Sequence, residues 1–182
     1  MVREEVVAES LDDRKGRSVT TRTFDELLIS IATGDSSAIP SLLASGFDIN
    51  GIGGKRRWTP LMYAAYEGNS DVIRALVENG AVVNFQDEYQ LTALHEAAVQ
   101  GNCDAARTLL ELGATVDAKT LQDVTPLMCA AAWGHCDVAK LLIEMRADIS
   151  LRDTRGGDAL MIAEEKGNDE VAELLEAAGA RQ

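Results

Sequence analysis

Hydrophobic and polar positions recur along this chain with a fixed period. Four segments of similar sequence (TPLMYAAYEGN, TALHEAAVQGN, TPLMCAAAWGH and DALMIAEEKGN) begin 33 residues apart, at Thr59, Thr92, Thr125 and Asp158. LVENGAVVN, which ends at Asn84, recurs at the same spacing as LLELGATVD and LIEMRADIS. A degenerate copy runs from Phe24 to Asn50, and GIGGKRRW adds one residue before the next unit. Such self-similarity is typical of repeat architectures.

Each unit predicts two short helices and a turn. Thr59 suits a helix N-cap, Pro60 the first helical position, and Gly68 a left-handed helix end. Apolar residues follow with helical spacing: Leu61, Ala64 and Ala65 on the first helix, and Val72, Ile73, Leu76 and Val77 on the second. Helices this short are marginal alone in water, so each must bury its apolar face against the next unit. We therefore expect an all-α solenoid of stacked helix-turn-helix units.

Five units are expected, from about residue 23 to residue 182. Their predicted bounds are about 23–57, 58–90, 91–123, 124–156 and 157–182. Residues 1–22 lack the period and hold five acidic and five basic residues, so a disordered tail is expected. In the last unit, Asp169, Glu170, Glu173 and Glu176 give the final helix the polar outer face of a terminal cap.

The repeated residues resemble ankyrin repeats. The resemblance rests on Thr-Pro-Leu at 59–61 and 125–127, Leu94-His95, the Gly-Ala-Val-Val-Asn close at 80–84, and the glycines Gly68, Gly101, Gly134 and Gly167. It implies helix pairs stacked in one direction, projecting β-hairpin fingers, and a concave face of fingers and first helices that binds partners. Departures from the pattern are Arg146, Gln90 and Asp123 in place of Gly, and Thr120 in place of Asp. We expect these four positions to be weak points, because a left-handed backbone costs about 1 kcal/mol at a residue with a Cβ.

Charge and composition argue against a nucleic-acid-binding or membrane protein. The chain has 17 basic and 30 acidic residues, a formal net charge of −13, which opposes binding to nucleic acid or to an anionic membrane surface. No apolar run is long enough to insert into a membrane. Three cysteines do not make a disulfide framework, so a cytoplasmic or nuclear protein is expected.

The candidate chemical groups favour structural roles. We expect His95 to bond the turn of the neighbouring unit and His135 to face solvent or a neighbouring loop. Adjacent helical residues such as His135 and Cys136 do not face each other, which argues against a Cys–His nucleophile. Cys103 and Cys136 lie too far apart for a disulfide, and Cys and His have no zinc spacing. GIGGK lacks the spacing of a phosphate loop. We therefore expect no catalytic residue, no metal and no cofactor; a cysteine nucleophile is the enzyme alternative.

Positions that packing leaves free predict a partner-binding surface. Five of the eight aromatic residues fall at such positions, and exposed aromatics often dominate interface energetics. The predicted partner-binding residues are Arg56, Arg57, Trp58, Tyr63, Tyr66, Glu67, Tyr89, Glu96, Val99, Gln100 and Trp133. Two alternatives stay open. Trp58 and Tyr63 are either surface residues or a small satellite core packed between finger and helix. Lys55-Arg56-Arg57 is either a solvated loop tip or a clamp for an acidic or phosphorylated segment.

The sequence thus predicts a non-catalytic adaptor or scaffold that binds a protein or an extended peptide. The alternative is a targeting or regulatory arm of a larger enzyme or channel. A monomer is expected, because self-repulsion disfavours pairing through the acidic faces.

Overall fold

The computed structural model describes the backbone of residues 19–179 and the side chains from Phe24 onward. The first repeat holds α2 (Val19–Thr33), a 3₁₀ turn (Ser36–Ala38) and α3 (Ile39–Ala44). The helix pairs that follow are α4 (Pro60–Glu67) with α5 (Ser70–Glu78), α6 (Ala93–Gln100) with α7 (Cys103–Glu111), α8 (Pro126–Trp133) with α9 (Cys136–Glu144), and α10 (Ala159–Lys166) with α11 (Asp169–Gly179). The predicted tail boundary at residue 22 falls inside α2, and residues 1–18 lie outside the described part of the chain.

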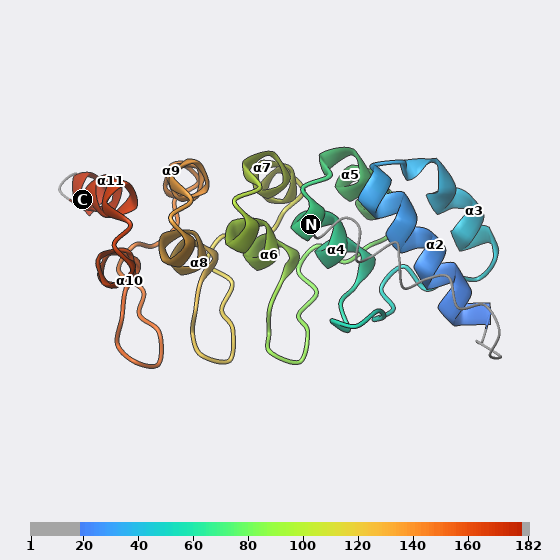
Figure 1. Ribbon diagram of the computed structural model, residues 1–182, viewed down its shortest axis with the longest axis horizontal. Helices are drawn as coiled ribbons and strands as arrows, with labels where there is room; N and C mark the ends of the chain where they lie inside the picture. Colours follow the sequence, from blue (N-terminus) through green and yellow to red (C-terminus); the bar gives the residue numbers. More distant parts are fainter. Residues whose placement is uncertain (1–18, 180–182) are drawn as a thin grey trace.

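The helix pairs stack side by side into an elongated array, which confirms the predicted repeat solenoid (Figure 1). The first helices α4, α6, α8 and α10 form one layer, and the second helices α5, α7, α9 and α11 form the other (Figure 1). Four loops, at 51–58, 84–91, 117–124 and 150–157, project from the first layer; we call them fingers 1 to 4. Within residues 19–179 the fingers contain no β-strand, only an isolated antiparallel bridge between Gly53 and Trp58.

The ends of the first helices follow the predicted pattern. The Thr59 side chain accepts a hydrogen bond from Met62 N at 3.3 Å, and Pro60 opens α4. Gly134 ends α8 with φ 73°, and a Cβ there would lie 2.8 Å from Asn168 Oδ1. A left-handed backbone and a close neighbour therefore both require glycine at this turn.

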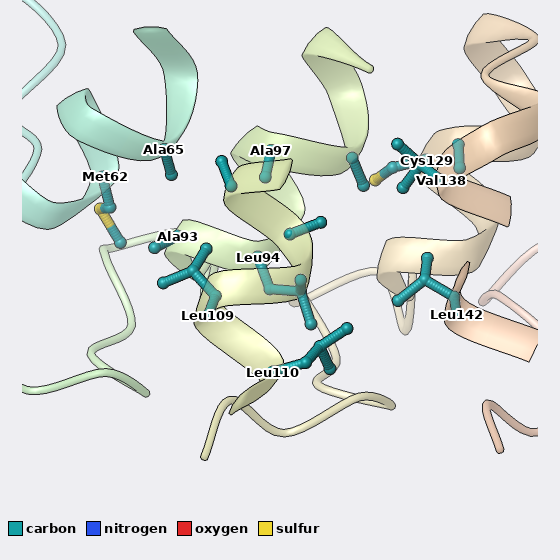
Figure 2. Close-up of a cluster of buried hydrophobic side chains, with 14 of the residues drawn as sticks. Met62, Ala65, Ala93, Leu94, Ala97, Leu109, Leu110, Cys129, Val138 and Leu142 are labelled. Atoms are coloured by element: carbon teal, nitrogen blue, oxygen red, sulfur yellow. The ribbon is translucent and has the colours of Figure 1, made fainter. Parts of the chain in front are cut away.

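A continuous core runs between the two layers. Small residues line the first helices, and Ala65 and Ala97 are fully buried. Figure 2 shows Leu94, Leu109 and Leu142 among the side chains of this core. Small side chains let the first helices approach closely, while larger ones fill the space beneath them. The core therefore crosses every repeat boundary from α4 to α10.

Polar side chains connect each repeat to the one before it. Asn102, just before α7, donates from Nδ2 to Ala65 O at 3.0 Å and to Tyr66 O at 2.8 Å. Asn168 makes the same pair of bonds to the end of α8, at 2.7 and 3.1 Å. These carbonyls lie in the last turn of a helix, where the regular intrahelical bonding ends; Ala65 O and Ala131 O also accept from the capping glycines Gly68 and Gly134. One repeat thus completes the hydrogen bonding of its neighbour.

Asn50 and Asn84 also bond the next repeat. Asn50 Nδ2 donates to Gly80 O at 3.1 Å, and Asn50 Oδ1 accepts from Val82 N at 2.8 Å. Asn84 makes the equivalent two bonds one repeat further on, at 3.0 and 2.8 Å. Both side chains therefore fasten the turn after the second helix of the following repeat.

Three of the four expected weak points have the left-handed backbone. Gln90, Asp123 and Arg146 have φ angles of 60°, 57° and 65°, and Arg57 joins them with 54°. Thr120 is different: its Oγ1 accepts from the backbone N–H groups of Gln122 and Val124 at 3.2 and 3.1 Å, as an Asp side chain does in other fingers. Its hydroxyl supplies the acceptor that the turn requires, and Thr120 does not have the left-handed backbone on which the expected weakness rested.

Candidate partner-binding surface

The first helix layer and the fingers present several exposed apolar side chains. Trp133, the last residue of α8, is 64% exposed, and Tyr89 at the tip of finger 2 is 55% exposed. Leu121 in finger 3 and Met161 on α10 are about half exposed. Sequence reasoning did not include Met161 in the site, because its equivalents in the inner repeats are buried and only the terminal repeat lacks a covering neighbour.

Backbone hydrogen bonds join fingers 2, 3 and 4 to one another. Leu121 N donates to Tyr89 O, and Thr154 N donates to Gln122 O, both at 3.0 Å. Gln86 Nε2 adds a bond to Lys119 O at 3.3 Å. Within residues 19–179, no backbone hydrogen bond connects finger 1 to finger 2. Finger 1 is therefore the only described finger outside this ladder.

Finger 1 is held instead by aromatic side chains. The Arg56 guanidinium carbon lies 4.7 Å from the centroid of the Trp58 ring and 4.7 Å from that of Tyr66. The two rings are 5.6 Å apart, and Arg56 Nη2 donates to Tyr66 Oη at 3.4 Å. Tyr63 packs on Trp58 at 5.3 Å and donates from Oη to Gly53 O at 3.3 Å. We call Arg56, Trp58, Tyr63 and Tyr66 the finger-1 cluster.

Two residues predicted for the surface are buried. Trp58 is only 6% exposed and Glu96 only 5%. Trp58 packs between finger 1 and α4, so the satellite-core alternative describes it. Glu96 lies on α6, which packs between α4 and α8. The expectation that both are freely exposed is therefore corrected.

The other predicted residues divide by exposure. Arg56, Arg57, Tyr89, Gln100 and Trp133 are exposed. Tyr63, Tyr66, Glu67 and Val99 are partly buried, and all but Glu67 pack against the core. The structure therefore brings the residues of finger 1 and α4 together in one cluster, while Trp133 stands two repeats away at the end of α8.

Glu96 has an unusual electrostatic environment. Burial raises the pKa of its carboxyl from 4.5 to about 7; the positive charge of Arg56 lowers this pKa and the negative charge of Asp87 raises it. Asp87 is a turn-forming residue whose Oδ1 accepts from Tyr89 N at 2.8 Å, and no sequence pattern marked it as part of the site. Glu96 thus interacts electrostatically with charged residues of fingers 1 and 2.

Both histidines have structural contacts. Thr92 N donates to His95 Nδ1 at 3.2 Å, and His95 Nε2 contacts Val124 O at 3.1 Å, which is the predicted bond to the neighbouring turn. Burial lowers the pKa of His95 to about 4, so the ring is neutral near pH 7. His135 Nε2 contacts Val99 O at 2.9 Å, in the preceding repeat, whereas the partner of His95 lies in the following one.

The cysteines are poorly suited to nucleophilic chemistry. Burial raises the pKa of Cys129 to about 12, and burial is also the largest cause of the raised pKa values of Cys103 and Cys136. A cysteine nucleophile reacts as the thiolate, which these environments disfavour. Among the described residues, no cluster of three His, Cys, Asp or Glu side chains is placed to hold a metal ion. Within residues 19–179, no helix is long and apolar enough to span a bilayer.

Comparisons with known proteins place these features in a family context. The family model for ankyrin repeats (3 copies) matches residues 27–120 and 116–182. The chain is also similar to proteins called "Ankyrin repeat, SAM and basic leucine zipper domain-containing protein 1". The protein from Carollia perspicillata is 36% identical over 76 residues, 42% of this chain and 16% of that protein. The one from Mus musculus is 41% identical over 64 residues, 35% of this chain and 13% of that protein. The match thus spans less than a fifth of either relative.

Proposed function

Because the chain belongs to the ankyrin-repeat family, whose repeats are general protein-interaction modules, we propose that it acts as a non-catalytic adaptor or scaffold. It binds a protein or an extended peptide across the face built by α4, α6, α8, α10 and the fingers. The observation that carries this proposal is Trp133, a large aromatic side chain that is 64% exposed on the first helix layer. Exposed tryptophans are frequent sources of binding energy in interfaces.

The experiment compares three full-length baits in native cell extract, with retained proteins identified by mass spectrometry. Trp133→Ala removes the proposed contact. Met145→Ala is the matched control, because Met145 is 43% exposed but lies at the end of α9, in the other helix layer. We expect a protein that the wild-type and Met145→Ala chains retain and the Trp133→Ala chain loses. Both substitutions are at the surface, so each should change the free energy of unfolding by less than about 0.5 kcal/mol.

Two outcomes would contradict the proposed surface. Equal retention by all three baits would place the binding site away from Trp133. A large fall in the melting temperature of Trp133→Ala would make this residue a packing element. Tyr66→Ala is a poorer probe, because Tyr66 also packs on Trp58 and Arg56 and its loss would disturb the finger-1 cluster.

A second candidate is a regulatory arm of a larger protein. It is favoured by the names of the matched relatives, which combine ankyrin repeats with a SAM and a basic leucine zipper domain. Sequencing of the full-length transcript separates the two candidates, since an arm requires a coding region for further domains.

A further inference from the structure

The finger-1 cluster already holds a cation. The guanidinium of Arg56 lies 4.7 Å from the centroids of both the Trp58 and the Tyr66 ring. Such distances are typical of cation–π attraction, which arginine makes with aromatic ring faces. The two rings therefore form an aromatic site that accommodates a guanidinium group.

Little else holds Arg56 in this position. Arg56 is exposed to solvent. Its backbone N–H donates to Tyr63 Oη and its Nη2 donates to Tyr66 Oη, and both hydrogen bonds are long, at 3.4 Å. The next residue, Arg57, has a left-handed backbone with φ 54°. Finger 1 also lacks the backbone ladder that fixes fingers 2 to 4. Arg56 can therefore leave the rings without breaking a backbone bond between fingers.

A buried carboxyl group on the neighbouring first helix interacts electrostatically with Arg56. Glu96 is 5% exposed and lies on α6, the helix that packs beside α4. The charges that act on Glu96 come from Arg56 on finger 1 and Asp87 on finger 2. The charge of Glu96 in turn adds to the effect of burial in raising the pKa of Cys129 on α8. A buried carboxylate is stabilised when a cation pairs with it.

We propose that the Trp58 and Tyr66 rings, with the Glu96 carboxylate, form a receptor for an arginine side chain of the protein partner, and that Arg56 occupies it as an internal stand-in. The proposal rests on the proposed function and names the chemistry of the partner: a basic, extended segment with at least one arginine. Charge complementarity supports it, since the chain carries a net charge of −13. The partner's guanidinium takes the place of Arg56 on the rings, and Arg56 swings into solvent.

The test measures binding of a defined probe to the full-length chain. The probe is the capped tripeptide acetyl-Gly-Arg-Gly-amide, and the comparator replaces arginine with citrulline, which has nearly the same shape without the charge. The readout is the indole N–H resonance of Trp58 in a Trp133→Phe background, where Trp58 is the remaining tryptophan. We expect a saturable shift with the arginine peptide and a response at least about fivefold weaker with citrulline.

Variants separate the receptor from general charge attraction. Arg56→Ala should bind the arginine peptide about threefold to tenfold more tightly, because the internal competitor is gone. Arg57→Ala removes the same charge from the neighbouring finger position and should not tighten binding. Adding Glu96→Gln to Arg56→Ala should reverse the gain while keeping the volume of the side chain.

The proposal is overturned if arginine and citrulline peptides act equally, or if Arg56→Ala and Arg57→Ala bind alike. Either result leaves the Trp133 capture experiment intact, so failure of the arginine receptor and failure of the proposed function are distinguishable. Loss of partner capture by Trp133→Ala together with a negative tripeptide result would place recognition on α8 and not on finger 1.

Discussion

The buried carboxyl of Glu96 makes the stability of the protein depend on pH in a direction unusual for an acid. Burial raises its pKa to about 7 in the folded chain, against 4.5 for an ordinary glutamate. Between these two pH values the folded chain keeps a proton that the unfolded chain has released. The free energy of unfolding contributed by this group therefore falls as the pH rises from about 4.5 and is lost above about pH 7.

The magnitude follows from the pKa difference. One pKa unit corresponds to about 1.4 kcal/mol, so the full loss is about 3 kcal/mol, of which about 2–3 kcal/mol falls between pH 5 and pH 8. His95 acts in the opposite direction, because burial lowers its pKa from 6.5 to about 4. Between these values the unfolded chain holds the extra proton, and stability rises with pH. The two groups partly cancel in the wild-type chain.

Glu96→Gln isolates the carboxyl, since His95 contributes equally to both proteins. We would measure urea unfolding by far-UV circular dichroism at pH 5, 6, 7 and 8. The advantage of the Gln chain over wild type should grow by about 2–3 kcal/mol from pH 5 to pH 8. Glu144→Gln, at an exposed position on α9, controls for the change in net charge. A constant difference between Glu96→Gln and wild type across this range would refute the reasoning, because it would mean that Glu96 is as well solvated when folded as when unfolded.

Two further predictions concern stability, one at a junction between repeats and one in the turn after α9. Asn102→Ala removes the bonds to Ala65 O and Tyr66 O and should lower the free energy of unfolding by about 1–3 kcal/mol in urea titrations, whereas Asn79→Ala, at an exposed helix end, should cost less. Equal losses would show that the Asn102 bonds to the end of α4 add no stability beyond that of an exposed side-chain bond. Arg146→Gly relieves a left-handed backbone with φ 65° and should raise the free energy of unfolding by about 0.5–1 kcal/mol; an unchanged or lower melting temperature would contradict this.

The periodic features of the fold were predictable from sequence because their causes are local and repeated. Thr59, Pro60 and Gly68 fix the ends of one helix by capping and backbone conformation, and the same residue types act again 33 residues on. The stripe of alanines and leucines is likewise determined by helical spacing. His95 was predictable in the same way, since its partner lies at a fixed place in the next repeat.

The candidate site was less predictable because its environment does not repeat. Glu96 shares its position on the first helix with Tyr63 and Cys129, and variation at this position was interpreted as freedom from packing. Burial there depends on the side chains of both neighbouring repeats, which the type of one residue does not reveal. Finger 1 carries an extra residue, so the other fingers gave no template for the stacking of Arg56 on Trp58.

The backbone ladder along fingers 2, 3 and 4 has a mechanical consequence. A force applied at the tips would be shared by the bonds from Leu121 N to Tyr89 O and from Thr154 N to Gln122 O, so these fingers would yield as a group. Finger 1, which ring contacts and the stacking of Arg56 hold against α4, would separate from the helices first. Under tension the fingers would therefore detach in a fixed order, with finger 1, the most N-terminal, before fingers 2 to 4.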